Sequence, residues 1–504
     1  MNSVEITAGW RAALALAVVA VSVGLFAAHF SVATTPHFNA DQAIHALMAE
    51  RFDWSRDAYY WGQDRLGSLL PFLGSLATLC GLDGLTAMVG VQAAVLLGCG
   101  LLWAWIVRDV LLAAVGFGAL LLPPYPFYEA VAVGHPYLGQ TLLGLGLLAL
   151  LEAERRANPV PAGVDGVSTR RAARYGPLRA VALPLVAAAS LWASELSVAL
   201  IVPAAWFYRG LLGRRGRENP GLFAVGGLIG ALGLWAAKSG APRQKGFARM
   251  FADPQECWAS VVHQWTEWST TLGGDGNKPF NFAFGWAVVA WILLWAITGW
   301  VRRTPTSPLT RALALAAVAS WAAVHASGWN AANGFPLRYF AASFTWGALA
   351  LLSYLHDGGH TKRSAVALGL LGLWGLQAWA AWSFTTQFST GAQGRLPRAE
   401  AEVLLREVLA RDSEAVFIGS YWNSYLLDGL SPKALGLPHE RDHCRDRRYQ
   451  QEVLNKPVVV AVAAGWLEVL PDTLRQYGTT WVKSGPTEHS SGTDYARYVR
   501  VEER

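Results

Sequence analysis

The sequence predicts an α-helical fold class: a polytopic membrane domain of about eleven spans, followed by a small extracytoplasmic α/β domain. The 504-residue chain is 53% hydrophobic but only 15% charged, whereas soluble chains carry about 25% charged residues. Its charges gather between long apolar stretches, and soluble composition begins only near residue 386. We therefore expect a membrane domain over 1–385, with a first extracytoplasmic loop at 33–82, and an α/β domain over 386–504.

Basic residues set the predicted topology. The formal net charge is +6, and most arginines lie in short segments that flank apolar stretches. Such clusters mark the cytoplasmic side of a membrane, which we favour over a patch for an anionic ligand or nucleic acid. The N-terminus then lies inside and the C-terminal domain outside. The two main clusters are Arg155, Arg156, Arg170, Arg171, Arg174 and Arg179, and Arg209, Arg214, Arg215 and Arg217.

The expected spans follow from hydropathy and these charges, since a helix needs roughly 20 apolar residues to cross a bilayer. Leu66–Gly81 is short, and counting it as a span would move the Arg155 cluster outside, so we predict an interfacial segment there. Arginines at both ends of Val181–Tyr208 predict a hairpin that turns near Ser194-Glu195. The other expected spans are Ala12–Val32, Thr86–Val107, Leu111–Leu122, Tyr137–Leu151, Leu222–Ala237, Phe284–Trp300, Leu313–Ala326, Tyr339–Tyr354 and Ala365–Trp382.

The C-terminal region shows the patterns of a small mixed sheet with helices. Cys257 and Cys444 both map outside, an oxidising side, and whether they pair stays open because a sequence gives no Cα separation. The expected helices are Ala399–Ala410 and Leu467–Tyr477, and the expected strands are Ala415–Ile418, Pro457–Val462, Trp481–Lys483 and Tyr498–Val501.

Asp41 is the first candidate for chemistry. It follows the first expected span, and the residues after it repeat at helical spacing, with Ile44, Leu47 and Met48 on one face. Asp41 or Asn39 could simply cap this helix. Alternatively, a partly desolvated carboxylate at the membrane boundary suits a general base.

Three motifs make the membrane part resemble a known class. Asp41 begins an Asp-x-Ala-x-x-x-Leu-Met-Ala stretch, Tyr60 begins a Tyr-Trp-Gly-Gln-x-x-x-Gly-Ser-Leu stretch, and Arg338-Tyr339-Phe340 opens a late span. In these features the chain resembles GT-C class membrane glycosyltransferases, in particular the protein O-mannosyltransferase and aminoarabinose-transferase branch of glycosyltransferase family 39 type. The resemblance implies an inverting hexosyl- or pentosyltransferase that uses a polyprenyl-phosphate sugar.

The resemblance also implies roles by position. Asp41 matches the acid that takes the proton of an acceptor hydroxyl. Arg338 matches an arginine expected at the donor phosphate, although an interfacial arginine that snorkels to headgroups is equally open. Arg243 and Lys245 are further phosphate candidates, in a Trp-rich loop that could instead anchor the chain at the interface. The substrate-binding candidates are Gln42, Tyr60, Trp61, Gln63, Glu129 and His135.

The chain departs from the family pattern at three places. Gln42 stands where the pattern usually has Glu, and neither Glu129 nor His135 cleanly replaces a second acid. Glu195 stands near a turn where relatives often carry Lys, which puts the type of donor in doubt. In the tail, the run from Tyr421 to Tyr425 suits carbohydrate contacts, but plain packing is the favoured interpretation.

The resemblance implies a polyprenyl-phosphate sugar donor, a glycan, lipid or protein acceptor, and a place in the bacterial inner membrane. We find no metal or cofactor motif and expect no cofactor, with a divalent cation left open. Two other classes stay open: a transporter or flippase, which would favour internal repeats, and a catalytically silent scaffold in envelope glycan assembly.

Overall fold

The chain forms two compact units in the computed structural model. The helical unit comprises Met1–Phe30, Asp64–Gly67 and Ala93–Thr386, and the sheet unit comprises Ser31–Gln63, Ser68–Gln92 and Gln387–Arg504. The structure describes residues 8–35, 38–63, 65–123, 127–132, 136–157, 169–212, 219–240, 249–273, 306–357, 369, 371–372, 374–375, 378–379, 381–382, 395–442, 444–490 and 492–501. The boundary between a membrane domain over 1–385 and an extracytoplasmic domain over 386–504 stays a prediction.

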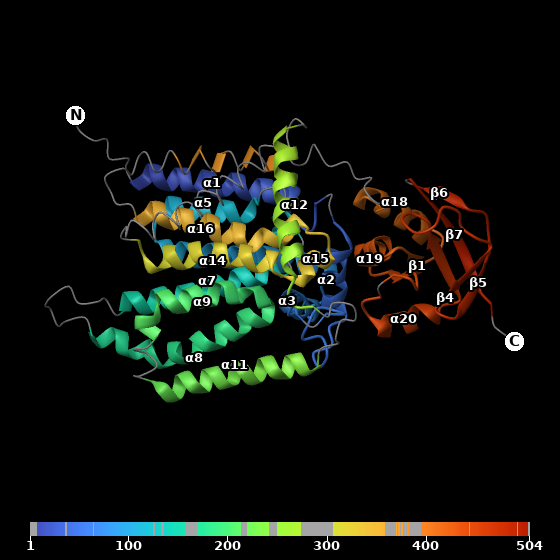
Figure 1. The fold of residues 1–504 in the computed structure, drawn as a ribbon. Helices are drawn as coiled ribbons and strands as arrows, with labels where there is room; N and C mark the ends of the chain where they lie inside the picture. The colour runs from blue at the N-terminus through green and yellow to red at the C-terminus, as the bar shows by residue number, and fades with distance from the viewer. Residues whose placement is uncertain are drawn as a thin grey trace. The chain divides into compact units, whose positions relative to one another are not determined.

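Apolar helices packed side by side make up the helical unit (Figure 1). A Cβ on Gly144 would lie 2.7 Å from Leu200 and 2.8 Å from Trp346, so glycine allows a close approach of helices there. The helices are α1 (Ala8–His29), α4 (Gly84–Val107, which begins in the sheet unit), α5 (Val110–Leu121), α6 (Glu129–Ala132), α7 (Tyr137–Ala157), α8 (Thr169–Ala193), α9 (Val198–Phe207), α11 (Pro220–Gly240), α12 (Pro254–Gly273), α14 (Pro308–His325), α15 (Gly328–Ala332) and α16 (Ala341–Asp357), with 3₁₀ turns η2 (Glu195–Ser197) and η3 (Leu337–Phe340).

Three helices among the described residues are long and apolar enough to cross a membrane: Gly9–His29, Gly84–Val107 and Pro220–Gly240. Shorter apolar helices accompany them. The total of about eleven crossings stays a prediction. The expected span Phe284–Trp300 and most of Ala365–Trp382 lie outside the described residues.

The structure bears on two local predictions about the apolar segments. Helix α8 ends at Ala193 and η2 begins at Glu195, so the segment breaks where the flanking arginines required a turn. Helix α3 (Leu69–Thr78) has only 10 residues, about 15 Å of helix. This is shorter than the roughly 30 Å of a hydrocarbon core, but α5 and α9 are short as well, so the interfacial location of α3 stays a prediction.

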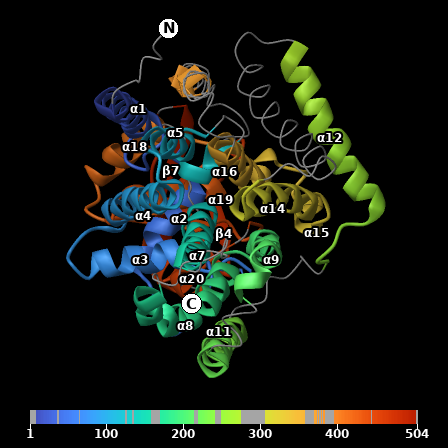
Figure 2. The ribbon, with the colours of Figure 1, turned by 90° about the vertical axis from the view of Figure 1, so that its left-hand side faces the viewer.

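Helix α12 runs across the other helices of its unit. In Figure 1 it lies crosswise to α1 and α11, and in Figure 2, where those two are seen nearly end-on, α12 is seen along its length. Hydrogen bonds fix it to its neighbours: the Ser260 hydroxyl lies 2.7 Å from His325 Nδ1 and accepts from Asn330 Nδ2 at 2.8 Å. This direction suits the Trp-rich segment predicted to lie in the membrane interface.

A seven-stranded mixed sheet forms the core of the sheet unit, in the order β2-β1-β3-β7-β5-β4 with β6 paired to β7. Strands β1, β2 and β3 are parallel, while β7 runs antiparallel to β3 and β5. Its elements are α18 (Arg398–Leu409), β1 (Ala415–Gly419), α19 (Tyr421–Leu430), β2 (Ala434–Pro438), α20 (Arg447–Leu454), β3 (Val458–Val462), β4 (Thr473–Gln476), β5 (Thr479–Lys483), β6 (Glu488–Ser490) and β7 (Thr493–Arg500).

The first loop of the chain is built into the sheet unit. Helix α2 (Ala40–Glu50) packs on α19, and a Cβ on Gly429 would lie 2.5 Å from the Cβ of Ala43. Arg398 Nη1 donates to the carbonyl of Val32 at 2.9 Å. The helix that carries Asp41 therefore belongs to the same folded body as the C-terminal residues.

The predicted helix over Leu467–Tyr477 is wrong. Leucines at helical spacing suggested it, but Pro471 has no N–H to donate, and Thr473–Gln476 alternates exposed and buried side chains as β4. This strand turns into β5 through Tyr477 and Gly478, both with positive φ, the geometry of a two-residue hairpin. The structure shows no disulfide at any of the four cysteines, which all lie among the described residues, so Cys257 and Cys444 are not paired in it.

Candidate functional site

Asp41 occupies the first turn of α2 without serving as its cap. The Asn39 side chain accepts from Asp41 N at 2.9 Å, and Gln42 Oε1 accepts from Asn39 N at 2.7 Å. The Asn39 side chain also accepts from the backbone N of Gln42, and with the return bond from Gln42 this makes a capping box. Within the described part of the chain, the Asp41 carboxylate accepts no hydrogen bond and forms no ion pair. Of the two interpretations left open by the sequence, capping thus falls to Asn39, and Gln42 supports that cap.

Two buried tyrosines lie close to Asp41. Tyr60, 3% exposed, donates its hydroxyl to the Asp41 carbonyl at 3.4 Å. Burial, and next the charge of Asp41, raises the pKa of Tyr60 well above its usual value. Burial likewise raises the pKa of Tyr421 to about 12, with Asp41 again contributing. Both phenols are therefore neutral at physiological pH. The Tyr421 hydroxyl can serve as a hydrogen-bond donor beside the carboxylate, whereas the Tyr60 hydroxyl already donates to the Asp41 carbonyl.

A cation from the C-terminal part of the chain completes this group. Arg445 Nε donates to the Tyr421 hydroxyl at 3.2 Å, and its guanidinium carbon lies 5.9 Å from the Tyr60 ring centre. The charges of Arg445 and Asp41 act on each other, yet no ion pair within 4 Å joins them. Arg445 Nη1 is buried and has no hydrogen-bond partner among the described residues. We call Asp41, Tyr60, Tyr421 and Arg445 the Asp41 cluster.

The residues after Tyr60 add further unsatisfied polar groups. Trp61 is 4% exposed and Gln63 is 5% exposed. Trp61 Nε1 and Gln63 Oε1 are buried without a hydrogen-bond partner in the part of the chain that the structure describes. Buried polar atoms normally find partners, so these two atoms are available to bond to a bound molecule.

An ionic clamp holds α2 against α19 next to this cluster. Asp428 has a fully buried side chain and lies 3.4 Å from Arg51 Nη2, while the Tyr449 hydroxyl lies 2.9 and 2.8 Å from its two oxygens. Arg51 also stacks 3.9 Å above the Tyr449 ring. Burial, opposed by the charge of Arg51, raises the pKa of Asp428 to about 7. The clamp fixes the helix on which Asp41 lies.

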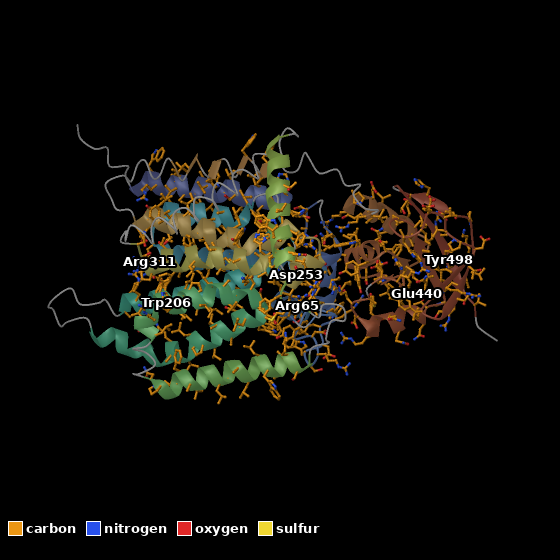
Figure 3. The ribbon with its side chains drawn as sticks, in the orientation of Figure 1. Arg65, Trp206, Asp253, Arg311, Glu440 and Tyr498 are labelled. Carbon is orange, nitrogen blue, oxygen red and sulfur yellow. The ribbon has the colours of Figure 1, made fainter. Side chains whose placement is uncertain are left out.

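Two cations lie on aromatic rings in the helical unit. Arg338 lies 5.5 Å from the Tyr339 ring centre, and Arg65 lies 3.9 Å from that of Trp329. The Trp329 and Tyr339 rings are 6.5 Å apart, so both guanidinium groups gather around one aromatic pair. We call these four residues the arginine–aromatic cluster. Figure 3 labels Arg65 in this unit.

The structure distributes the residues predicted from the sequence over both units. Asp41, Gln42, Tyr60, Trp61 and Gln63 lie in the sheet unit, and Arg338 lies in the helical unit. Glu129 begins the short helix α6 of the helical unit. Arg243, Lys245 and His135 lie outside the described residues.

Sequence reasoning missed Arg65 and Arg445 as site residues. Arg65 stands within the aromatic motif of the first loop, which was a usable signal. Arg445 stood in a run of charges between His439 and Arg448 that is typical of a solvated loop. The acid at Glu195, whose role was open, pairs with Lys238 Nζ at 2.9 Å in an exposed position.

Metal ligands are not gathered in the described part of the chain. No group of three or more His, Cys, Asp or Glu side chains is placed there to hold a metal ion.

The chain was compared with family models, curated proteins and solved structures. No family model and no curated protein matches the chain. The chain is similar to the crystal structure of ArnT from Cupriavidus metallidurans bound to undecaprenyl phosphate. The TM-score is 0.48 at 14% identity, over 97% of this chain and 98% of that one. We base the function proposed below on this chain's own side chains.

Proposed function

We propose that the chain is an integral membrane glycosyltransferase that moves a sugar from a polyprenyl-phosphate donor to an acceptor hydroxyl on the extracytoplasmic side. The observation that carries the proposal is the state of Asp41. Its capping duty is taken by Asn39 and Gln42, and its carboxylate stays unpaired among the described residues, beside neutral phenols and a buried guanidinium. A carboxylate that has no partner is available to accept the proton of a bound hydroxyl.

The reaction that we propose is a direct displacement. Asp41 takes the proton of the acceptor hydroxyl while that oxygen bonds to the anomeric carbon of the sugar. The bond between that carbon and the phosphate oxygen breaks, and its electron pair leaves on the lipid phosphate. Such a leaving group needs cations rather than an acid. We assign this role to Arg65 and Arg338 of the arginine–aromatic cluster, whose planar guanidinium groups suit phosphate oxygens.

Trp61 and Gln63 are our candidates for contacts to the sugar. A sugar presents apolar ring faces and hydroxyl groups, which an indole and an amide can contact together. The buried Trp61 Nε1 and Gln63 Oε1, unpartnered within the described residues, would then be satisfied by substrate. Substitution of either residue should raise KM for the donor or the acceptor, while the stability of the folded chain stays close to that of the parent.

The proposed orientation rests on the ends of the helical unit. Figure 3 labels Trp206 and Arg311 toward one end and Arg65 and Asp253 toward the other. Trp206 immediately precedes the Arg209 cluster, and Arg155 and Arg156 end α7. Arginine-rich ends are cytoplasmic by the positive-inside rule, so we place Arg65 on the extracytoplasmic side of a bacterial inner membrane.

The test is sugar transfer in membrane vesicles that contain the full chain, supplied with a panel of labelled polyprenyl-phosphate sugars. We expect transfer of at least one sugar, and loss of it in Asp41→Asn. The matched control is Asp472→Asn, because the Asp472 side chain is 99% exposed. Equal transfer by the parent and Asp41→Asn would refute Asp41 as the base. A parent chain that transfers no sugar but moves a lipid-linked sugar across the vesicle membrane would be a flippase instead.

A further inference from the structure

We infer that Arg445, from the C-terminal part of the chain, is a substrate-binding residue that holds a phosphate-type anion of a substrate opposite Asp41. The inference rests on the proposed function and deepens it. It assigns to the sheet unit a direct role in binding, where packing alone was the favoured interpretation of the residues after Tyr421.

The unmet hydrogen-bonding capacity of Arg445 is the first argument. Its backbone N donates to the Tyr425 hydroxyl at 2.8 Å and its Nε to Tyr421 at 3.2 Å. Nη1 is buried with no partner in the described part of the chain. Arg445 is partly exposed as a residue, but a guanidinium N–H that is taken out of water needs a counter-charge or a hydrogen bond. The guanidinium is thus fixed through Nε, and its buried Nη1 remains available to donate to a ligand.

The missing counter-charge is the second argument. Asp41 is near enough to influence Arg445, but the two form no ion pair within 4 Å. Asp442 lies in the same loop, yet its carboxylate Oδ2 accepts from Tyr421 N at 2.7 Å. Elsewhere in the sheet unit, two arginines do pair with carboxylates: Arg51 with Asp428, and Arg448 with Asp57 at 3.3 Å. Arg445 stands apart from them in lacking a described carboxylate partner.

The neighbours of Arg445 favour an oxygen-rich anion. Tyr421 keeps its proton because burial raises its pKa, so its hydroxyl, which accepts from Arg445 Nε, can donate alongside the guanidinium. Planar guanidinium groups bind phosphate oxygens through paired N–H donors. A hydroxyl held by Asp41 and an anion held by Arg445 would then be oriented by a single rigid group of side chains.

Two sources share this chemistry: the phosphate of the polyprenyl donor and an anionic group on the acceptor. The test compares Arg445→Gln and Arg445→Lys in the purified full chain, with Arg441→Gln as the matched control, because Arg441 is an exposed arginine of the same loop. Arg445→Lys keeps the charge and loses the planar fork, so it should weaken binding less than Arg445→Gln does.

The first arm measures stabilisation by inorganic phosphate, since a ligand raises stability only through the state that binds it. We expect the parent and Arg441→Gln to be stabilised, and Arg445→Gln to need about tenfold to a hundredfold more phosphate for the same shift. This arm needs no sugar transfer, so its outcome is independent of the proposed activity. Equal phosphate dependence in all variants would overturn the inference.

The second arm identifies the source. If Arg445→Gln weakens binding of undecaprenyl phosphate at least about tenfold, the anion belongs to the donor. If that binding is unchanged while KM for the acceptor rises by a similar factor with kcat retained, the anion belongs to the acceptor. If Arg445→Gln does not fold, the same comparisons are made with Arg445→Lys. A lysine variant that matches the parent in every arm would contradict the role of the guanidinium.

Discussion

The clamp between Asp428, Arg51 and Tyr449 makes a quantitative prediction about pH. Asp428 is fully buried, and its pKa rises from 3.8 to about 7 because burial outweighs the charge of Arg51. The folded chain therefore holds a proton that the unfolded chain releases at lower pH. This contribution to stability is complete below about pH 4 and is lost as the pH rises through about 7.

The size of the effect follows from linkage. Between about pH 5 and about pH 7, unfolded Asp428 is ionised while the folded group is still largely protonated, so stability falls by about 1 kcal/mol or slightly more per pH unit. The total expected loss over this interval is about 2 kcal/mol. Glu50, which also faces Asp428, adds to the raised pKa, and the Tyr449 hydroxyl opposes it.

The assay is pulse proteolysis of the full chain in detergent and urea, read on a C-terminal tag that reports the sheet unit. The variant Asp428→Asn cannot titrate but can keep a hydrogen bond to Tyr449. We expect the parent to lose about 2 kcal/mol relative to Asp428→Asn between about pH 5 and about pH 7. A parent that gains stability relative to Asp428→Asn over this interval, or a constant difference between the two, would refute the reasoning.

Two further predictions concern packing and surface charge. Gly429→Val should destabilise the sheet unit by about 1–3 kcal/mol, because a Cβ at this position would lie 2.5 Å from that of Ala43. The control in the same proteolysis assay is Gly485→Val, because Gly485 has open space around it. Equal stabilities of the two variants would contradict close packing of α2 on α19. Glu195→Gln should change the free energy of unfolding by less than about 1 kcal/mol in the same assay, because the ion pair with Lys238 is exposed. Loss of sugar transfer with unchanged stability would instead give Glu195 a functional role.

Local signals in the sequence predicted several features of the fold. The break at Ser194 followed from arginines at both ends of an apolar segment, and the helix after Asp41 from its apolar spacing. The cap of that helix was ambiguous between Asn39 and Asp41, because either side chain can accept from the first turn. Only the observed hydrogen bonds separate the two.

Long-range contacts could not be predicted from one sequence. Arg51 and Asp428 are 377 positions apart, and Arg398 and Val32 are 366 apart, so no periodicity relates them. For the same reason, the packing of the first loop within the sheet unit could not be predicted from its own sequence. Arg445 was overlooked because a charge run gives no sign of which of its members is buried.

The central claim is that Asp41 is the general base, and the rate of a single round of sugar transfer at saturating donor tests it most directly. For Asp41→Asn we expect a rate about a hundredfold to ten-thousandfold below that of the parent, with binding of undecaprenyl phosphate unchanged and Asp472→Asn behaving as the parent. An Asp41→Asn rate within about twofold of the parent would contradict the claim, since removal of a general base cannot leave the rate so nearly unchanged.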